Sequence, residues 1–208
     1  MKDASSAPGD GEITALLARL RTGDRDAMDL LVPLLYVELR RRAHNQLLAH
    51  RPGDTLGTTA LVHETYLKLA ASRESGYVDR IHFLAVASRA MRQLIVDEAR
   101  RKLSAKRGGG LAATPLEEHH HGTEQPAEVH ERAARLVALD AALDRLADLD
   151  TRLARTVELR FFGEMSVEDT AAALDVSPRT VKRDWQKARA FLHAALGDAA
   201  EAVAPPAP

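Results

Sequence analysis

The chain has 208 residues, carries 29 basic and 30 acidic side chains for a formal net charge of −1, and contains no cysteine. These features exclude a disulfide framework, a thiolate metal site and a strongly basic coat protein for nucleic acid. No apolar run approaches the length of a membrane span or of a signal-peptide core, so we expect a cytoplasmic protein without membrane insertion.

Charge is distributed unevenly along this nearly neutral chain. Residues 80–107 contain eight basic and two acidic side chains, whereas residues 111–131 contain five acidic side chains and neither Lys nor Arg. A second basic segment, residues 177–193, contains five basic side chains and one acidic one. Because clustered Lys and Arg are typical of nucleic-acid binding, the pattern predicts two basic helices separated by an acidic connector.

The N-terminal part of the chain predicts two helices after a polar start. Residues 1–11 are small and polar, and we expect them to be disordered. Apolar residues at helical spacing over residues 13–20 predict a short helix that is closed by Gly23. A longer amphipathic pattern over residues 24–50 contains Pro33, which should kink this helix or mark its true start.

A third helix is predicted for the stretch TTALVHETYLKLAAS, with Thr58 or Thr59 as its N-cap. Leu61, Thr65 and Leu69 recur at steps of four, so they should lie on the buried side.

A loop and a fourth helix follow. Residues 73–79 predict a loop with an exposed Tyr77. Residues 80–107 predict a long helix whose first half is apolar and whose second half is basic.

Residues 108–128 are rich in Gly and Pro and predict a flexible acidic linker. The run His119–His121 lies within it. Adjacent histidines in a flexible loop do not build a fixed site with supporting partners, so we expect no functional metal site and no cofactor.

The C-terminal part predicts two helices and then a pair of helices joined by a turn. Apolar spacing indicates helices over residues 129–149 and 150–162, with Phe161 facing inward and Gly163 ending the second helix. After residue 196, an Ala- and Pro-rich tail, residues 197–208, is expected to be disordered.

A helix–turn–helix is predicted between residues 166 and 196. Ser166 and Asp169 form a capping box, and Ser177 followed by Pro178 starts the second helix. Asp175 stands in the turn where glycine is common, and Asp tolerates left-handed geometry better than most residues. An ordinary helical hairpin with a solvated basic face would show the same pattern. The outward face of the second helix carries Arg179, Lys182, Arg183, Lys187 and Arg189.

No alternating strand pattern occurs, so the predicted fold class is all-α, with two small helical domains joined by a flexible linker and a helix–turn–helix in the second domain. The predicted domains are residues 12–107 and 129–196, on either side of the linker 108–128. Two tethered basic surfaces can bind two sites on one DNA molecule, because the tether raises the local concentration of the second surface.

Three segments in this order resemble the extracytoplasmic-function (ECF) sigma factors of bacterial RNA polymerase. ALVHETYLKL resembles the clamp-binding helix of the family, whose usual form is close to DLVQETFLRL. RIHFLAVASRAMRQLIVDEARRK resembles the promoter-melting and −10-recognition helix, and LRFFGEMSVEDTAAALDVSPRTVKRDWQKARAFL resembles the −35-binding helix–turn–helix. The resemblance covers most of residues 12–196 and implies a sigma factor that directs core RNA polymerase to promoters and melts them.

The resemblance also implies roles for matching residues. The clamp helices of core polymerase would meet His63, Glu64 and Lys68, and the flap would be a second polymerase contact. The −35 element would be read by Arg179, Thr180, Lys182, Arg183 and Lys187. The −10 element would be recognised and melted by Tyr77, which stacks on an unpaired base, and by His82, Phe83, Arg89, Arg92, Arg100, Arg101 and Lys102. The implied partners are core RNA polymerase, promoter DNA and an anti-sigma factor, and initiation needs no catalytic residue in this chain.

Two other functions stay open on the sequence. A helix–turn–helix repressor or activator would dimerise and bind a palindrome without being a polymerase subunit. A helical enzyme or metal protein would need a spaced ligand set, a phosphate-cradling glycine loop or a nucleophile–base pair, and none is found.

Overall fold

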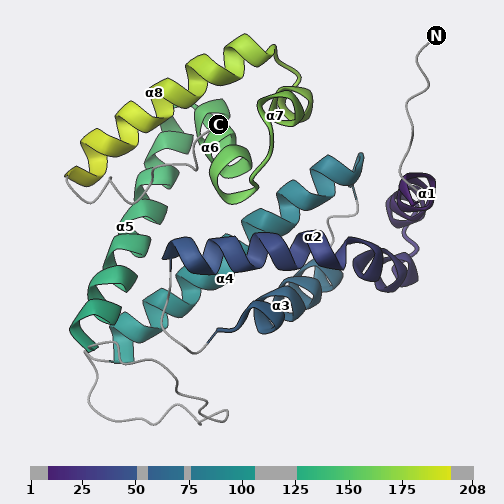
Figure 1. Ribbon diagram of the computed structural model, residues 1–208, viewed down its shortest axis with the longest axis horizontal. Coiled ribbons are helices and arrows are strands. Elements are labelled where there is room, and N and C mark those ends of the chain that lie inside the picture. Colours follow the sequence, from purple (N-terminus) through teal and green to yellow (C-terminus); the bar gives the residue numbers. More distant parts are fainter. Residues whose placement is uncertain (1–8, 51–55, 73–75, 106–125, 198–208) are drawn as a thin grey trace.

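The computed structural model describes four stretches of the chain, residues 9–50, 56–72, 76–105 and 126–197. Every regular element in these stretches is helical, which confirms the all-α class (Figure 1). The elements are α1 (Asp10–Arg21), α2 (Asp26–His50), α3 (Thr58–Ala71), α4 (Arg80–Ala105), α5 (Pro126–Leu149), α6 (Thr151–Val157), the π-helical turn η1 (Glu158–Phe162), α7 (Val167–Leu174) and α8 (Pro178–Leu196).

Two predicted segments fall largely outside the described residues. The N-terminal segment 1–11 is described only from residue 9, and α1 already begins at Asp10. Of the predicted linker 108–128, only the last three residues are described, and they form the start of α5 instead of a loop. The His119–His121 run and the tail from residue 198 lie outside the described part of the chain.

Helices α1 to α4 form the N-terminal half, and two expectations for it are wrong: that Pro33 could be the start of α2, and that a threonine caps α3. Pro33 does not mark the start of α2, because the helix begins at Asp26 and continues through the proline. Burial of Leu31 and Leu35 on either side of Pro33 contributes about 1.5–3 kcal/mol each, which offsets the roughly 3 kcal/mol cost of an internal proline. The N-cap of α3 is Gly57 in extended geometry, so no threonine hydroxyl caps this helix.

Helices α5 to α8 form the C-terminal half. The carboxylate of Asp150 caps α6 by accepting hydrogen bonds from the backbone N–H groups of residues 152 and 153. The predicted helix to residue 162 changes to the π-helical turn η1 after Val157. The wider turn alters which side chain faces inward, so Phe162 is buried while Phe161 is only half-buried. Gly163 ends η1, and a Cβ atom at this position would lie 2.6 Å from the carbonyl oxygen of Leu159.

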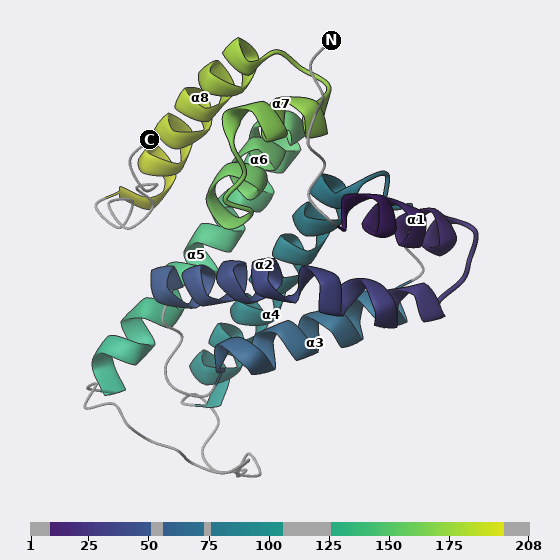
Figure 2. The ribbon, with the colours of Figure 1, turned by 45° about the vertical axis from the view of Figure 1, so that its right-hand side comes forward.

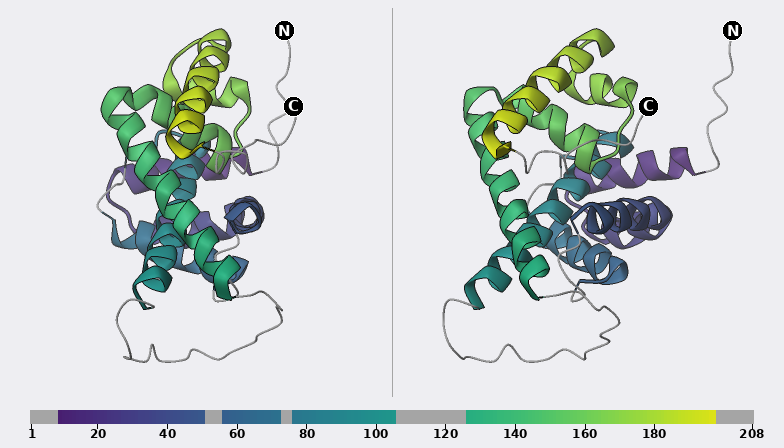
Figure 3. Two further views of the ribbon diagram at one scale, coloured as in Figure 1. Left: turned by 90° about the vertical axis from the view of Figure 1, so that its left-hand side faces the viewer. Right: turned by 60° about the vertical axis from the view of Figure 1, so that its left-hand side comes forward.

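The two halves pack against each other along α4 and α5 (Figures 2 and 3). In both views of Figure 3, α5 spans from the end of α4 to the group formed by α6, α7 and α8. Four apolar side chains of the C-terminal half belong to the same buried cluster as the N-terminal helices: Ala133, Leu136, Leu159 and Met165. Because of this packing, α4 lies at the boundary between the halves.

Candidate nucleic-acid interface

The turn between α7 and α8 has the geometry that its sequence predicts. Ser166 Oγ accepts a hydrogen bond from the Asp169 N–H at 2.9 Å, and Ser177 Oγ accepts one from the Thr180 N–H at 3.2 Å. Asp175 ends α7 in the left-handed region, with φ 52° and ψ 49°. The Val176 N–H then donates to the carbonyl oxygen of Ala171 at 3.0 Å. Local capping chemistry therefore fixes where α8 begins and how it leaves the turn.

Helix α8 has one buried face and one basic exposed face. Val181, Ala188 and Leu192 are buried, and Ala188 and Leu192 belong to the apolar cluster of the C-terminal half. The predicted −35 contacts lie on the other side: Arg179, Lys182, Arg183 and Lys187 are exposed, and Thr180 is half-buried. Four cationic side chains are thus presented to solvent over the first ten residues of α8, as a helix that enters the major groove requires.

Asp184 is a buried position of α8 whose ion pair the sequence pattern did not predict. Sequence reasoning treats it only as the single acid among basic residues, yet its side chain is 1% exposed. Arg152 Nε, from α6, donates to Asp184 Oδ2 at 2.6 Å, and Arg183 Nε lies 3.5 Å from Oδ1. The hydrogen bond to Asp184 and the carboxylate charge raise the pKa of Arg152. This ion pair joins α6 to α8 and so sets the position of the basic face.

We expect Asp184→Ala to lower the thermal unfolding midpoint and to weaken DNA binding, because α8 loses its polar connection to α6. Differential scanning calorimetry and a filter-binding assay measure the two effects. Asp148→Asn, which removes a negative charge from an exposed position of α5, serves as the control and should change neither quantity. Unchanged stability and DNA affinity in Asp184→Ala would show that the ion pair does not position the helix.

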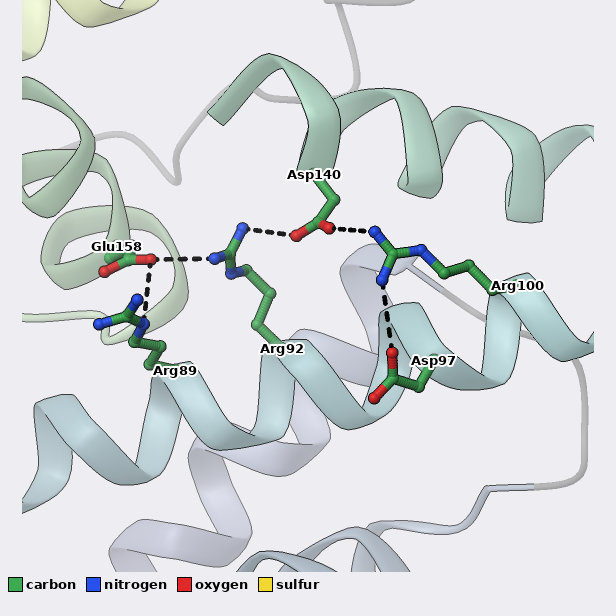
Figure 4. A network of polar contacts seen from close by, with 6 residues as sticks. All are labelled: Arg89, Arg92, Asp97, Arg100, Asp140 and Glu158. Carbon is green, nitrogen blue, oxygen red and sulfur yellow. Dashed lines mark hydrogen bonds and ion pairs between the residues drawn. The ribbon is translucent and has the colours of Figure 1, made fainter. Parts of the chain in front are cut away.

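Some of the predicted −10 residues of α4 lie at the boundary with the C-terminal half, and others lie on the free surface. Arg92 is 6% exposed and donates to Asp140 Oδ1 at 2.8 Å and to Glu158 Oε1 at 3.0 Å (Figure 4). Arg100 donates to Asp140 Oδ2 at 2.9 Å, and Arg89 Nε lies 3.7 Å from Glu158 Oε1.

Further along α4, the predicted basic surface is partly neutralised by the helix itself. Arg101 and Lys102 both pair with Glu98, at 2.7 and 3.9 Å. Arg101 remains well exposed, so its guanidinium group is accessible to phosphate despite this pairing.

The aromatic residues at the start of α4 belong to the core. Tyr77 was predicted to be exposed, and this is wrong: its side chain is 1% exposed and its ring lies edge-on to Phe83, with 5.1 Å between the ring centroids. Phe83 is also fully buried. Half-buried His82 accepts a hydrogen bond at Nδ1 from the Val78 N–H at 3.2 Å, which fixes the approach of the chain to α4. In this conformation Tyr77 and Phe83 present no surface to DNA.

The predicted polymerase contacts lie on the free face of α3. His63, Glu64 and Lys68 are exposed, while the opposite face, which includes Leu61 and Leu69, is buried.

A hydrogen bond fixes the orientation of α3 relative to α2. Tyr66 Oη donates to Asp29 Oδ1 at 2.6 Å, and this bond raises the pKa of Tyr66. The free face of α3 is therefore held in a defined direction.

Two further kinds of site are absent from the part of the chain that the structure describes. No group of three or more histidine or acidic side chains there is arranged to hold a metal ion. None of the described helices combines the length and the hydrophobicity needed to cross a bilayer.

An all-α chain that presents a basic helix after a short capped turn has the features of a DNA-binding transcription protein. The family model described as ECF sigma factor matches residues 10–198, and the chain belongs to this family. The protein is therefore a sigma factor that acts in transcription initiation, with core RNA polymerase and promoter DNA as its partners. Comparisons with curated proteins and with solved structures found no match.

Proposed function

We propose that this sigma factor directs core RNA polymerase by reading the −35 element with α8 and the −10 element with α4, where it also stabilises the melted strand. The observation that carries the proposal is the exposed basic face at the start of α8. The capped turn and the buried Asp184 hold that face in a fixed direction. An Arg side chain near the N-terminus of such a helix reaches guanine O6 and N7 in the major groove.

The −10 surface is proposed to consist of those α4 side chains that can reach solvent. Arg89, Arg100 and Arg101 are exposed, and Lys102 and His82 are half-buried. Arg92 becomes available only when its partners in the C-terminal half withdraw. Tyr77 and Phe83 support this surface by packing beneath it.

The clamp helices of core polymerase are proposed to dock on α3 at His63, Glu64 and Lys68. These side chains share the exposed face of the helix, and Leu67, which is also exposed, adds apolar area between them. A polar rim around a small apolar centre is typical of protein interfaces. The flap and an anti-sigma factor stay proposed partners without assigned contact residues.

Base reading and phosphate contact are distinguished by two single substitutions in the reconstituted holoenzyme. Arg183→Ala should cost about 1–3 kcal/mol of promoter affinity and relax specificity at one −35 position. Arg101→Ala should instead weaken binding to all promoters by a similar factor and reduce the salt slope by about one. Selection from a randomised promoter library, repeated at several salt concentrations, measures both effects.

Arg25→Ala is the matched control, because it removes one exposed cation from the turn between α1 and α2. It should leave affinity and specificity unchanged. If Arg183→Ala weakened binding to all promoter sequences by the same factor, Arg183 would be a phosphate contact. That result would contradict the proposed base reading.

A further inference from the structure

Two arginines from neighbouring helices share the buried carboxylate of Asp184. Helix α6 packs against α8 (Figure 1). Arg152 Nε, from α6, donates to Asp184 Oδ2 at 2.6 Å, and Arg183 Nε, from α8, lies 3.5 Å from Oδ1. The Asp184 side chain is 1% exposed, whereas both arginine side chains reach solvent. The surface at this point therefore presents two guanidinium groups and hides the carboxylate that joins them.

Arg152 differs from an arginine that only neutralises a buried acid. Arg92 is 6% exposed and donates through both of its Nη groups to two carboxylates. The Arg152 side chain is 44% exposed, and its hydrogen bond to Asp184 uses the Nε–H. The other N–H groups of this guanidinium, on the two Nη atoms, remain for a further partner. One edge of Arg152 is thus anchored in the protein, and the other is presented to solvent.

The anchoring also distinguishes Arg152 from Arg183. The contact of Arg183 with Asp184 is longer, and Asp184 Oδ1 accepts no hydrogen bond from any residue that the structure describes. Arg183 can therefore turn toward a base edge without breaking a hydrogen bond. Movement of Arg152 would leave the buried carboxylate without its one hydrogen bond, which is costly. A fixed arginine suits a phosphate, because phosphate contacts set the position of a protein on the duplex.

The location of α6 fits the edge of the groove that α8 would enter. When a recognition helix lies in the major groove, the helices beside it meet the phosphate backbone. Arginine forms paired hydrogen bonds with phosphate as it does with carboxylate. We infer that Arg152 is a phosphate contact of the −35 site, so that the DNA-binding surface extends from α8 onto α6. The inference rests on the proposed function of α8.

The salt dependence of promoter binding by the reconstituted holoenzyme tests this contact. We expect Arg152→Gln to reduce the slope of log affinity against log salt concentration by about one, and to weaken binding to all −35 sequences by the same factor. Arg152→Lys keeps a cation at this position and should keep the slope. The control Arg145→Gln removes an exposed cation from α5 and should change neither slope nor affinity.

Two results overturn the phosphate contact. One is a salt slope in Arg152→Gln equal to that of Arg145→Gln. The other is a changed base preference at the −35 element in Arg152→Gln, because Arg152 would then act only by positioning α8. If Arg152→Gln is unfolded by circular dichroism, the double variant Arg152→Gln/Asp184→Asn, which leaves no unpaired buried charge, is compared with Asp184→Asn under the same two criteria.

The same measurements separate the inference from the proposed function. If the unsubstituted holoenzyme prefers a −35 motif and Arg152→Gln leaves the slope unchanged, α8 keeps its proposed role and only the contact from α6 is overturned. If the unsubstituted holoenzyme shows no −35 preference, the proposed function and the inference are both contradicted.

Discussion

Phe162→Ala should destabilise the protein by about 3–5 kcal/mol, as expected for loss of a buried aromatic side chain that leaves a cavity. The Phe162 side chain is 1% exposed. Its ring lies edge-on to Phe161, with 4.9 Å between centroids, and faces the Arg92 guanidinium group. The substitution removes one contact within η1 and one contact across the boundary between the halves, and urea denaturation followed by circular dichroism measures the loss.

Phe161→Ala is the matched control for this substitution. The same atoms are removed one residue earlier, but the Phe161 side chain is only half-buried. We expect a clearly smaller loss of unfolding free energy for Phe161→Ala. Equal losses of unfolding free energy in the two variants would contradict the finding that η1 turns Phe162, and not Phe161, toward the core.

The second large effect is expected at Tyr77. Tyr77→Ala should cost about 3–5 kcal/mol of unfolding free energy, whereas Tyr77→Phe should cost little. The ring of Tyr77 is buried against Phe83, and Tyr77→Phe keeps that packing. Thermal and urea unfolding of the two variants measure this difference.

The same pair of variants tests the alternative role of Tyr77 as a base-stacking residue. Because stacking on an unpaired base needs an exposed ring, a stacking role predicts a stable Tyr77→Ala protein that fails to open promoters. Permanganate footprinting of the promoter bubble detects this failure. A stable but melting-deficient Tyr77→Ala variant would contradict the buried position of Tyr77.

Features determined within a few residues of the chain were predicted well. The start of α8 follows from Ser177 and Pro178, and the left-handed turn falls on Asp175 as expected. The buried stripe of α3, with Leu61, Thr65 and Leu69, follows from helical spacing alone and is confirmed. Capping and amphipathic periodicity act over one or two turns, so the local sequence contains the information that they need.

Features that depend on distant partners were not predicted. Asp140 pairs with Arg92 across 48 residues, and Asp184 pairs with Arg152 across 32. Burial of a charged side chain is stable only with such a partner, and periodicity carries no information about a partner on another helix. The same reason applies to Tyr77, whose burial depends on how its loop folds back onto α4.

The most direct test of the account is transcription by core RNA polymerase reconstituted with this protein on a pool of genomic templates, with the start sites sequenced. We predict initiation at a defined set of promoters that share −35 and −10 motifs, and loss of the −35 preference in Arg183→Ala. Absence of initiation above the level of core polymerase alone, with a folded protein, would contradict the account.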